Sequence, residues 1–245
     1  MIKKVLLFIV LLLIIAYLII ALTAFSGKPA DQVCQRVELI IKDSVNAGFI
    51  TRDEVGSLLR KKGLYPIGKK MESIRTDLLE KQLNEHPLIE NVECYKTPGG
   101  SLCVEVTQRL PILRVMSNKG ENYYIDNKGK IMPPEANCVA HLAIVTGNVD
   151  KTFATKDLYK FGLFLQNDKF WDAQIEQINI TPEKEVELVP RVGEHIVFLG
   201  KIDNFEEKLA KLKLFYEKAL NQVGWNKYSR ISLEFNNQII CTKKE

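Results

Sequence analysis

The sequence is poor in the side chains that most often bind metal ions or act as nucleophiles. It has 245 residues, but only five cysteines and three histidines. No two cysteines are spaced as Cys-x-x-Cys, and the odd number leaves at least one thiol unpaired in a monomer. The histidines, His86, His141 and His195, are far apart, and each lies beside an expected turn or strand end. These absences indicate neither a metal site nor a disulfide framework.

Motifs that would identify an enzyme are also missing. The chain contains no His-Glu-x-x-His, Gly-x-Ser-x-Gly, Walker or Gly-x-Gly-x-x-Gly pattern. Asp203 and Glu206 resemble a carboxylate pair, but their spacing fits the start of a helix better. Asp126 precedes Asn-Lys-Gly and is expected to stabilise that turn rather than bind a cation. Cys103, near His86, has no third residue to orient a base, so a structural role is expected. We therefore predict no catalytic residue, cofactor or metal, and interpret the chain as not an enzyme.

Charge of one sign is nowhere concentrated. The chain has 34 basic and 30 acidic residues, a net charge of +4, and no basic patch that would indicate nucleic-acid binding. The lysines of Lys208–Lys213 are expected on the solvent face of an amphipathic helix. Trp171 and Trp225 are expected to pack in or beside a core rather than bind a ligand. No internal repeat or low-complexity tail is present.

The one long hydrophobic run is Val5–Phe25, which contains no charged residue. At about 1.5 Å per residue, a helix of this length crosses a hydrocarbon core of about 30 Å. Lys3 and Lys4 before it favour a cytoplasmic N-terminus. A cleaved signal peptide is the alternative, since Ala24-Phe25-Ser26 is a weak cleavage site. The run is longer than a usual signal core, so we predict an uncleaved membrane anchor.

After this run, the chain predicts a small module that ends in a β-hairpin. Asn91–Thr97 and Ser101–Arg109 are expected strands, joined by the loop Pro98-Gly99-Gly100. A three-residue loop pairs Thr97 with Ser101 and gathers apolar residues on one face: Val92, Cys94, Leu102, Val104 and Val106. Cys94 and Cys103 then point to opposite faces, and we predict no disulfide between them.

Three further elements precede the hairpin, and the two helices among them are expected to cover its apolar face. Val37–Lys42 alternates as a strand with Val37, Leu39 and Ile41 inward. Thr51-Arg-Asp-Glu54 is a capping box for a helix that ends at Gly63. A second helix covers about Arg75–Glu85. The order β-α-α-β-β is thus predicted.

The remainder predicts a second α+β unit. A hairpin surrounds the turn Asp126–Gly129, and the helix after Asp203 is expected to reach about Val223 with Leu209, Leu212, Tyr216 and Leu220 toward the core. The other expected elements are the strands Leu142–Val145, Ile175–Ile180, Val186–Arg191, His195–Leu199, Arg230–Phe235 and Gln238–Thr242, and the helix Lys156–Gln166.

With these motifs in this order, the chain resembles the FtsQ/DivIB family of bacterial cell-division proteins. Phe49-Ile-Thr-x-x-Glu-Val, His86-Pro-Leu-Ile-x-x-Val, Pro98-Gly-Gly-Ser-Leu-x-Val-x-Val and Arg109-Leu-Pro-Ile-Leu are similar to the family's POTRA domain. Tyr123–Ile131 and His141–Gly147 are similar to the start of its second domain. The chain departs from the family where Leu88 replaces a frequent Trp, Gln108 a usual Glu and Met132 a frequent Phe.

The resemblance implies an α+β protein in a fixed order of parts. These are a cytoplasmic tail at 1–4, a transmembrane helix at 5–25, a linker at 26–32 and a β-α-α-β-β POTRA domain at 33–116. A mixed α/β domain with an antiparallel-rich sheet follows at 117–243, and a tail at 244–245. The bulk of the chain would be periplasmic and attached to the inner membrane.

The resemblance also implies a function in septum formation. The chain would be a non-catalytic scaffold that binds FtsB and FtsL and helps to recruit septal wall-synthesis enzymes. Nucleic acid and small-molecule substrates are not expected partners. A membrane-tethered sensor or enzyme outside the cytoplasm is the alternative, but no convergent set of catalytic residues supports it.

The expected binding segment is the strand near the C-terminus. In the family, the terminal part of the second domain receives a strand from FtsB, and a strand near the chain end often lies at a sheet edge. Lys213 or Tyr216 on the preceding helix is expected to help hold the partner. The alternative is that this strand only completes the fold or pairs with Gln238–Thr242. The residues expected to bind are Tyr228, Arg230, Ile231, Ser232, Leu233, Glu234 and Phe235.

Overall fold

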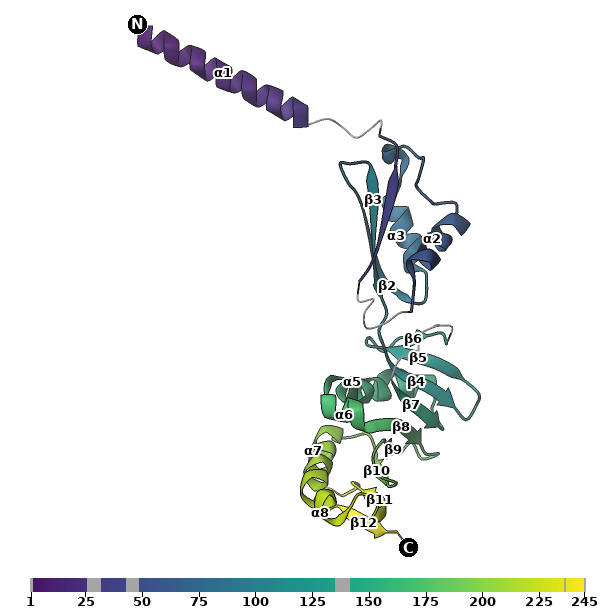
Figure 1. The fold of residues 1–245 in the computed structure, drawn as a ribbon. Helices are drawn as coiled ribbons and strands as arrows, with labels where there is room; N and C mark the ends of the chain where they lie inside the picture. Colours follow the sequence, from purple (N-terminus) through teal and green to yellow (C-terminus); the bar gives the residue numbers. More distant parts are fainter. Residues whose placement is uncertain (1, 26–31, 43–48, 135–141, 236, 245) are drawn as a thin grey trace. The chain divides into compact units, whose positions relative to one another are not determined.

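The computed structural model (Figure 1) describes residues 2–25, 32–42, 49–134, 142–235 and 237–244. Most of the expected linker, together with Gly48, Cys138, His141 and Asn236, lies outside the described residues. The chain divides into two compact units. Apart from α1, the first consists mainly of residues 32–40, 52–83 and 92–106, and the second of residues 41–51, 84–91 and 107–245.

Helix α1 (Ile2–Phe25) covers the apolar run and ends at the expected residue. Its described side chains are those of residues 9–21, and the large apolar ones among them are exposed. Within the described part of the chain, no helix is both long enough and apolar enough to cross a membrane. The membrane anchor therefore stays a prediction.

The first unit has the predicted β-α-α-β-β order. Its sheet has the strand order β1-β3-β2, and two helices, α2 and α3, lie on one side of it (Figure 1). The turn register is as expected, because Thr97 N donates to Ser101 O at 2.9 Å and Gly100 has a φ of +74°. The elements are β1 (Arg36–Lys42), α2 (Arg52–Lys61), η2 (Met71–Ser73), α3 (Thr76–Asn84), β2 (Ile89–Lys96) and β3 (Ser101–Gln108).

The hairpin buries the five residues assigned to its apolar face, but Cys103 on the other face is also buried, at 2 % exposure. The Tyr95 side chain contacts the Cys103 thiol, and its hydroxyl donates to Glu105 Oε1 at 2.8 Å. Burial raises the pKa of the Cys94 thiol to about 12, so it stays protonated at neutral pH. The four described cysteines are free thiols.

The second unit is a mixed sheet with the strand order β12-β11-β10-β9-β8-β7-β4-β5-β6. The pairs β4–β7, β7–β8 and β10–β11 are parallel, and the other five neighbouring pairs are antiparallel. The predicted antiparallel-rich sheet is therefore confirmed. Its strands are β4 (Pro111–Ser117), β5 (Asn122–Asp126), β6 (Ile131–Met132), β7 (Ala143–Gly147), β8 (Ile175–Ile180), β9 (Val186–Pro190), β10 (Ile196–Gly200), β11 (Tyr228–Ser232) and β12 (Ile240–Lys243).

Strand β4 belongs to the larger sheet and not to the domain to which the sequence assigned it. Residues up to Met116 were assigned to the first domain, yet β4 pairs with β5 and β7 inside the larger sheet. The larger sheet therefore begins at Pro111, directly after the hairpin, because β4 supplies the strand on which both neighbours align.

Helices cover one face of the larger sheet and bury its core (Figure 1). Helix α6 was not expected from the sequence. Asp168 caps it by accepting from Phe170 N at 2.8 Å, and it carries the buried Trp171. The helical segments are α4 (Lys151–Phe153), η3 (Ala154–Leu158), α5 (Tyr159–Asn167), α6 (Lys169–Gln174), α7 (Phe205–Phe215), η4 (Tyr216–Leu220) and α8 (Asn221–Val223).

Asp126 has the turn role that the sequence predicts. Its Oδ1 accepts from Lys128 N at 2.9 Å and from Lys130 N at 2.7 Å, which fixes the hairpin β5–β6. Its Oδ2 lies 3.4 Å from Arg109 Nη1. The carboxylate thus holds a turn and one guanidinium.

The three departures from the family pattern lie together around Phe49. The Phe49 ring packs with Leu88, Met132 and Tyr124 in one small cluster. Gln108 is fully buried, and its Oε1 accepts from the backbone N–H groups of Phe49 and Ile50, each at 3.1 Å. An amide serves here because one acceptor oxygen satisfies both donors while its Nε2 donates to Lys42 O.

Lys208 is a correction to the sequence interpretation. It was expected on the solvent face of α7 but is buried, with Nζ donating to Leu199 O, Lys201 O and Asp203 Oδ1. The expected capping role of Asp203 is also wrong. Asn204 precedes α7 and makes no side-chain capping bond, and the Asp203 carboxylate is turned toward Lys208 instead.

Candidate protein-binding edge of the larger sheet

The edge of the larger sheet nearest the C-terminus is β12, not the strand that the sequence favoured. Strand β11 is paired on both sides, in parallel with β10 and antiparallel with β12. Ser232, for example, lies opposite Phe198 on one side and Ile240 on the other. The prediction that Tyr228–Phe235 forms the edge is therefore wrong. The structure contains instead the alternative arrangement, a closing hairpin of β11 and β12.

Most of the seven predicted binding residues help to build the sheet. Ile231 and Leu233 are buried in the core. Arg230 lies over the Phe198 ring at 4.4 Å, and its Nη1 is 2.9 Å from Glu187 Oε1. Ser232 and Tyr228 are half-buried, and Tyr228 packs against the Phe215 ring. Only Glu234 and Phe235 of the seven are exposed.

The two predicted helix contacts differ in their position. Tyr216 is only 1 % exposed, so its expected place at a partner surface is wrong. Lys213 is half-buried, with Nζ 4.8 Å from the centre of the Phe170 ring. Helical periodicity had placed Tyr216 in the core as well, and that interpretation is confirmed.

The register of β12 shows which backbone groups it leaves open. Lys244 N donates to Lys227 O at 3.0 Å, and Lys243 lies opposite Tyr228. Backbone groups alternate in direction along an antiparallel strand, so those of Thr242 point toward β11. The N–H and C=O groups of Cys241 and Lys243 consequently point away from β11, toward the open edge.

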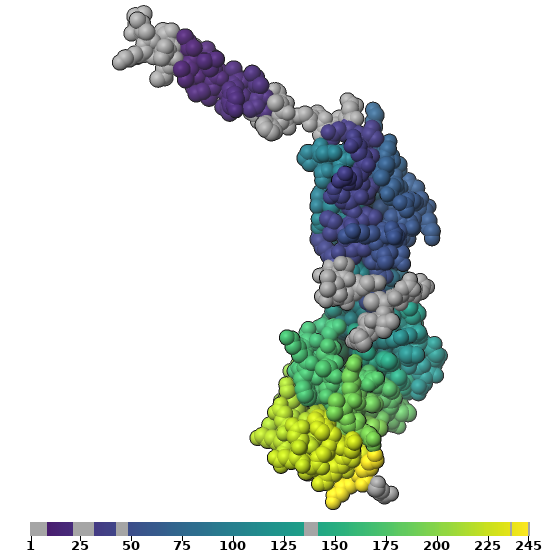
Figure 2. All heavy atoms as spheres, in the orientation of Figure 1, coloured from purple at the N-terminus to yellow at the C-terminus, as the bar shows by residue number. Residues whose placement is uncertain are grey.

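Exposed apolar and basic side chains accompany this edge. Ile240 is 45 % exposed and Phe235 49 % exposed, and Lys227 and Lys243 are exposed as well. Lys244 is paired with Glu194, which lowers the pKa of that carboxyl group through a hydrogen bond. Figure 2 shows this C-terminal segment in yellow at the molecular surface. The edge therefore offers backbone hydrogen bonds, apolar contact and positive charge together.

A buried aromatic cluster supports the start of β11. His195 is buried, its Nε2 lies 2.8 Å from the Tyr216 hydroxyl, and the Trp225 ring packs beside both residues. Nδ1 has no partner of good geometry among the described residues, although the backbone of Trp225 lies close. Burial lowers the pKa of His195, and the Trp225 backbone opposes this only in part.

This cluster predicts an acid-dependent loss of stability. A histidine in the unfolded chain has a pKa of about 6.5, and His195 in the folded protein has a lower pKa. At pH values between the two, His195 therefore binds a proton when the protein unfolds. The free energy of unfolding should therefore decrease between the unfolded and the folded pKa, by up to about 1.4 kcal/mol per pH unit.

Urea unfolding from pH 7 to pH 5, followed by tryptophan fluorescence, measures this dependence. His195→Gln should reduce its slope, whereas Tyr216→Phe should lower stability at every pH and keep the slope, because the imidazole remains. An unchanged slope in His195→Gln would assign the dependence to other groups.

Among the described residues, no group of three or more His, Cys, Asp or Glu side chains is arranged to hold a metal ion. Sequence reasoning expected a strand at Gln238–Thr242, but it did not name the residues of β12 as binding residues. A signal for the edge was present, since a short strand that ends in lysines is typical of the edge of a sheet.

Comparison with known proteins gives two family matches and one curated relative. The family described as FtsQ/DivIB, C-terminal related, matches residues 110–242, and the POTRA-like domain matches residues 32–107. The chain is 26 % identical over 197 residues to the cell division protein FtsQ of Rhodothermus marinus (strain ATCC 43812 / DSM 4252 / R-10), covering 76 % of this chain and 72 % of that protein. The two matched regions meet at residues 107–110, where β3 ends and β4 begins.

Proposed function

The chain belongs to the FtsQ/DivIB family of cell-division proteins, and from this we propose that it is a non-catalytic scaffold of the bacterial divisome. It binds FtsB- and FtsL-type proteins and helps to recruit the enzymes that build septal peptidoglycan. It acts by protein–protein binding, and its ligand is another polypeptide rather than a small molecule.

The proposal includes a membrane anchor. The run Val5–Phe25 has no charged residue, and Lys3 and Lys4 precede it. In this arrangement α1 anchors the protein in the inner membrane with its N-terminus in the cytoplasm, and both units work in the periplasm.

The observation that carries the binding proposal is the open edge of β12. The backbone groups of Cys241 and Lys243 face away from β11, so an FtsB-type segment can add a strand there. Main-chain hydrogen bonds supply affinity, and the exposed Phe235 and Ile240 select apolar side chains in the partner. Lys227 and Lys243 favour acidic ones.

Lys243→Pro tests this edge directly. Proline removes an N–H that points outward, which an edge strand tolerates, and its ring obstructs the added strand. We expect Lys243→Pro to weaken binding of the FtsB-type protein from the same bacterium by about ten-fold or more. Biolayer interferometry with the full chain in detergent measures this affinity.

Lys243→Ala is the matched control, because it removes the side chain and keeps the N–H. It should weaken binding by less than about three-fold. Tryptophan fluorescence verifies that both variants fold. Wild-type affinity in a folded Lys243→Pro variant would contradict strand addition at β12.

A further inference from the structure

One end of the first unit is built from three segments that meet where the linker enters it. Cys34 N donates to Lys69 O at 2.9 Å, which joins the chain just after the linker to the loop that follows α2. The loop of the β2–β3 hairpin lies at the same end, because Gln35 N donates to Gly100 O at 3.0 Å. We call this surface the linker end, and its segments are residues 32–35, 64–72 and 96–100.

The exposed side chains of the linker end are apolar and basic. Ile67, in the loop after α2, is 48 % exposed, and Val33 beside it in the fold is 43 % exposed. Basic side chains outnumber acidic ones by three to one within these described segments. The exposed lysines are Lys69, Lys70 and Lys96, and the exposed carboxylate is that of Glu72. The linker end therefore combines apolar contact with positive charge.

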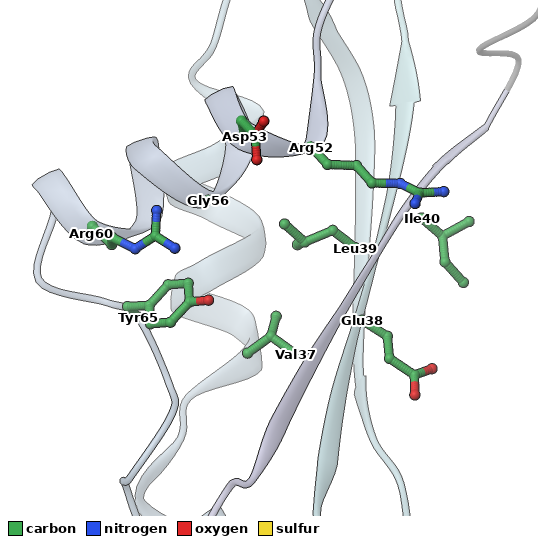
Figure 3. Close-up of a pocket in the computed structure, with 9 residues that line it drawn as sticks. All are labelled: Val37, Glu38, Leu39, Ile40, Arg52, Asp53, Gly56, Arg60 and Tyr65. Atoms are coloured by element: carbon green, nitrogen blue, oxygen red, sulfur yellow. The ribbon is translucent and has the colours of Figure 1, made fainter.

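A groove elsewhere on the first unit has charge of both signs. It lies between β1 and α2 and has a volume of about 480 Å³ (Figure 3). The guanidinium groups of Arg52 and Arg60 line it, but so do the carboxylates of Glu38 and Asp53. This groove favours no ligand of one charge, whereas the linker end favours an anionic one.

The proposed membrane anchor holds the linker end near the bilayer. Residues 26–31 separate α1 from Gln32, and a fully extended chain of this length spans at most about 25 Å. The headgroup layer itself takes about 5–8 Å of that distance. The linker contains one lysine and one aspartate, Lys28 and Asp31, so it adds no net charge. A surface tethered so closely needs only weak contacts to stay bound, because its encounter with the bilayer is intramolecular.

We propose that the linker end binds the surface of the bilayer that holds α1, with anionic phospholipid headgroups as its ligand. Its lysines pair with the headgroup phosphates, and each strengthens binding by about five-fold. Ile67 enters the boundary between the headgroups and the acyl chains. This contact fixes the orientation of the first unit on the membrane. The inference rests on the anchor in the proposed function, but not on partner binding at β12.

Fluorescence quenching in nanodiscs tests this contact with the full chain. A bimane label is attached after Gly99→Cys, in an exposed loop position where a Cβ meets no atom within 4 Å. Cys138 and Cys241 are replaced by serine, and the three buried thiols stay in place. The quencher is a nitroxide on the lipid headgroup.

The lipid composition should control the quenching. We expect quenching in discs of equal parts phosphatidylglycerol and phosphatidylcholine to exceed that in discs of phosphatidylcholine alone by about two-fold or more. Salt at about 1 M should remove this difference, because the Debye length then falls to about 3 Å.

Two pairs of charge reversals separate the linker end from the general charge of the protein. Lys70→Glu with Lys96→Glu should lower quenching in the anionic discs to the level in phosphatidylcholine. Lys69 is kept, because its Nζ donates to Gly63 O at 3.0 Å and holds the end of α2. Arg52→Glu with Lys81→Glu makes the same change of charge at exposed positions outside the linker end and should preserve most of the difference. Circular dichroism verifies the fold of each variant.

The outcomes distinguish failure of the anchor from failure of this inference. A chain that does not co-elute with the nanodiscs has no anchor, and that result would overturn both. In an inserted chain, equal quenching in the two lipids, or equal loss in the two reversed pairs, would overturn lipid binding by the linker end and leave the anchor standing. Strand addition at β12 is tested separately by Lys243→Pro.

Discussion

Gly147→Ala is expected to destabilise the second unit by about 3–5 kcal/mol, a large part of the stability of such a unit. Gly147 has a φ of +89°, and a Cβ there would lie 2.2 Å from Ile180 O and 2.7 Å from Asn179 Oδ1. The Ile180 carbonyl is fixed, since it accepts from Asn148 N at 2.8 Å beside the parallel pairing of β7 and β8. Relief of the clash therefore requires these central strands to separate.

Gly120→Ala is the control for the backbone conformation alone. Gly120 has a φ of +81°, close to that of Gly147, but a Cβ there meets no atom within 4 Å. It should cost about 1 kcal/mol. Urea unfolding followed by tryptophan fluorescence compares the two variants, because Trp171 and Trp225 both lie in the second unit. Equal losses would show that the contact with Ile180 is easily relieved.

Alternation and turn patterns predicted the local structure of the hairpin in the first unit well. The hairpin β2–β3, its three-residue loop and the face that holds Val92 and Val104 follow from period-two alternation and a Pro-Gly-Gly turn. These patterns depend only on residues that are close in the sequence, so one sequence alone is enough to recognise them.

Strand order could not be obtained in the same way. Alternation placed Ile231 and Leu233 correctly in the core, but it gives only the face of a strand and not its neighbours. Whether β11 or β12 forms the edge depends on the parallel pairing of β11 with β10, which lies some thirty residues earlier in the chain. Position near the C-terminus was a poor substitute for this long-range information.

Short elements and single polar side chains were missed for a different reason. Helix α6 has six residues, too few to establish a helical period, and only the Asp168 cap marks it. Lys208 was judged by its charge, yet a lysine can bury its ammonium group when backbone carbonyls converge on it. Such convergence arises from the path of the loop between β10 and α7, which local patterns do not specify.

Lys208→Met is expected to destabilise the second unit by about 2–3 kcal/mol. Methionine keeps the length and apolar stem of the side chain but leaves Leu199 O and Lys201 O without the donor at 3.2 and 2.9 Å. The ion pair itself contributes less, because the Asp203 side chain is 67 % exposed. Hydrogen bonding from Lys208 lowers the pKa of Asp203, so this smaller contribution is present at neutral pH and is lost as the pH falls through that lowered pKa.

Unfolding of three variants separates these contributions. Lys218→Met, at an exposed lysine in η4, should change the free energy of unfolding by less than about 0.5 kcal/mol. Asp203→Asn should cost less than Lys208→Met, because the two carbonyls keep their ammonium donor. If Lys208→Met costs no more than Lys218→Met, the carbonyls are satisfied by solvent and Lys208 does not hold the loop. If Asp203→Asn costs as much as Lys208→Met, the ion pair and not the carbonyls is the source of the stability.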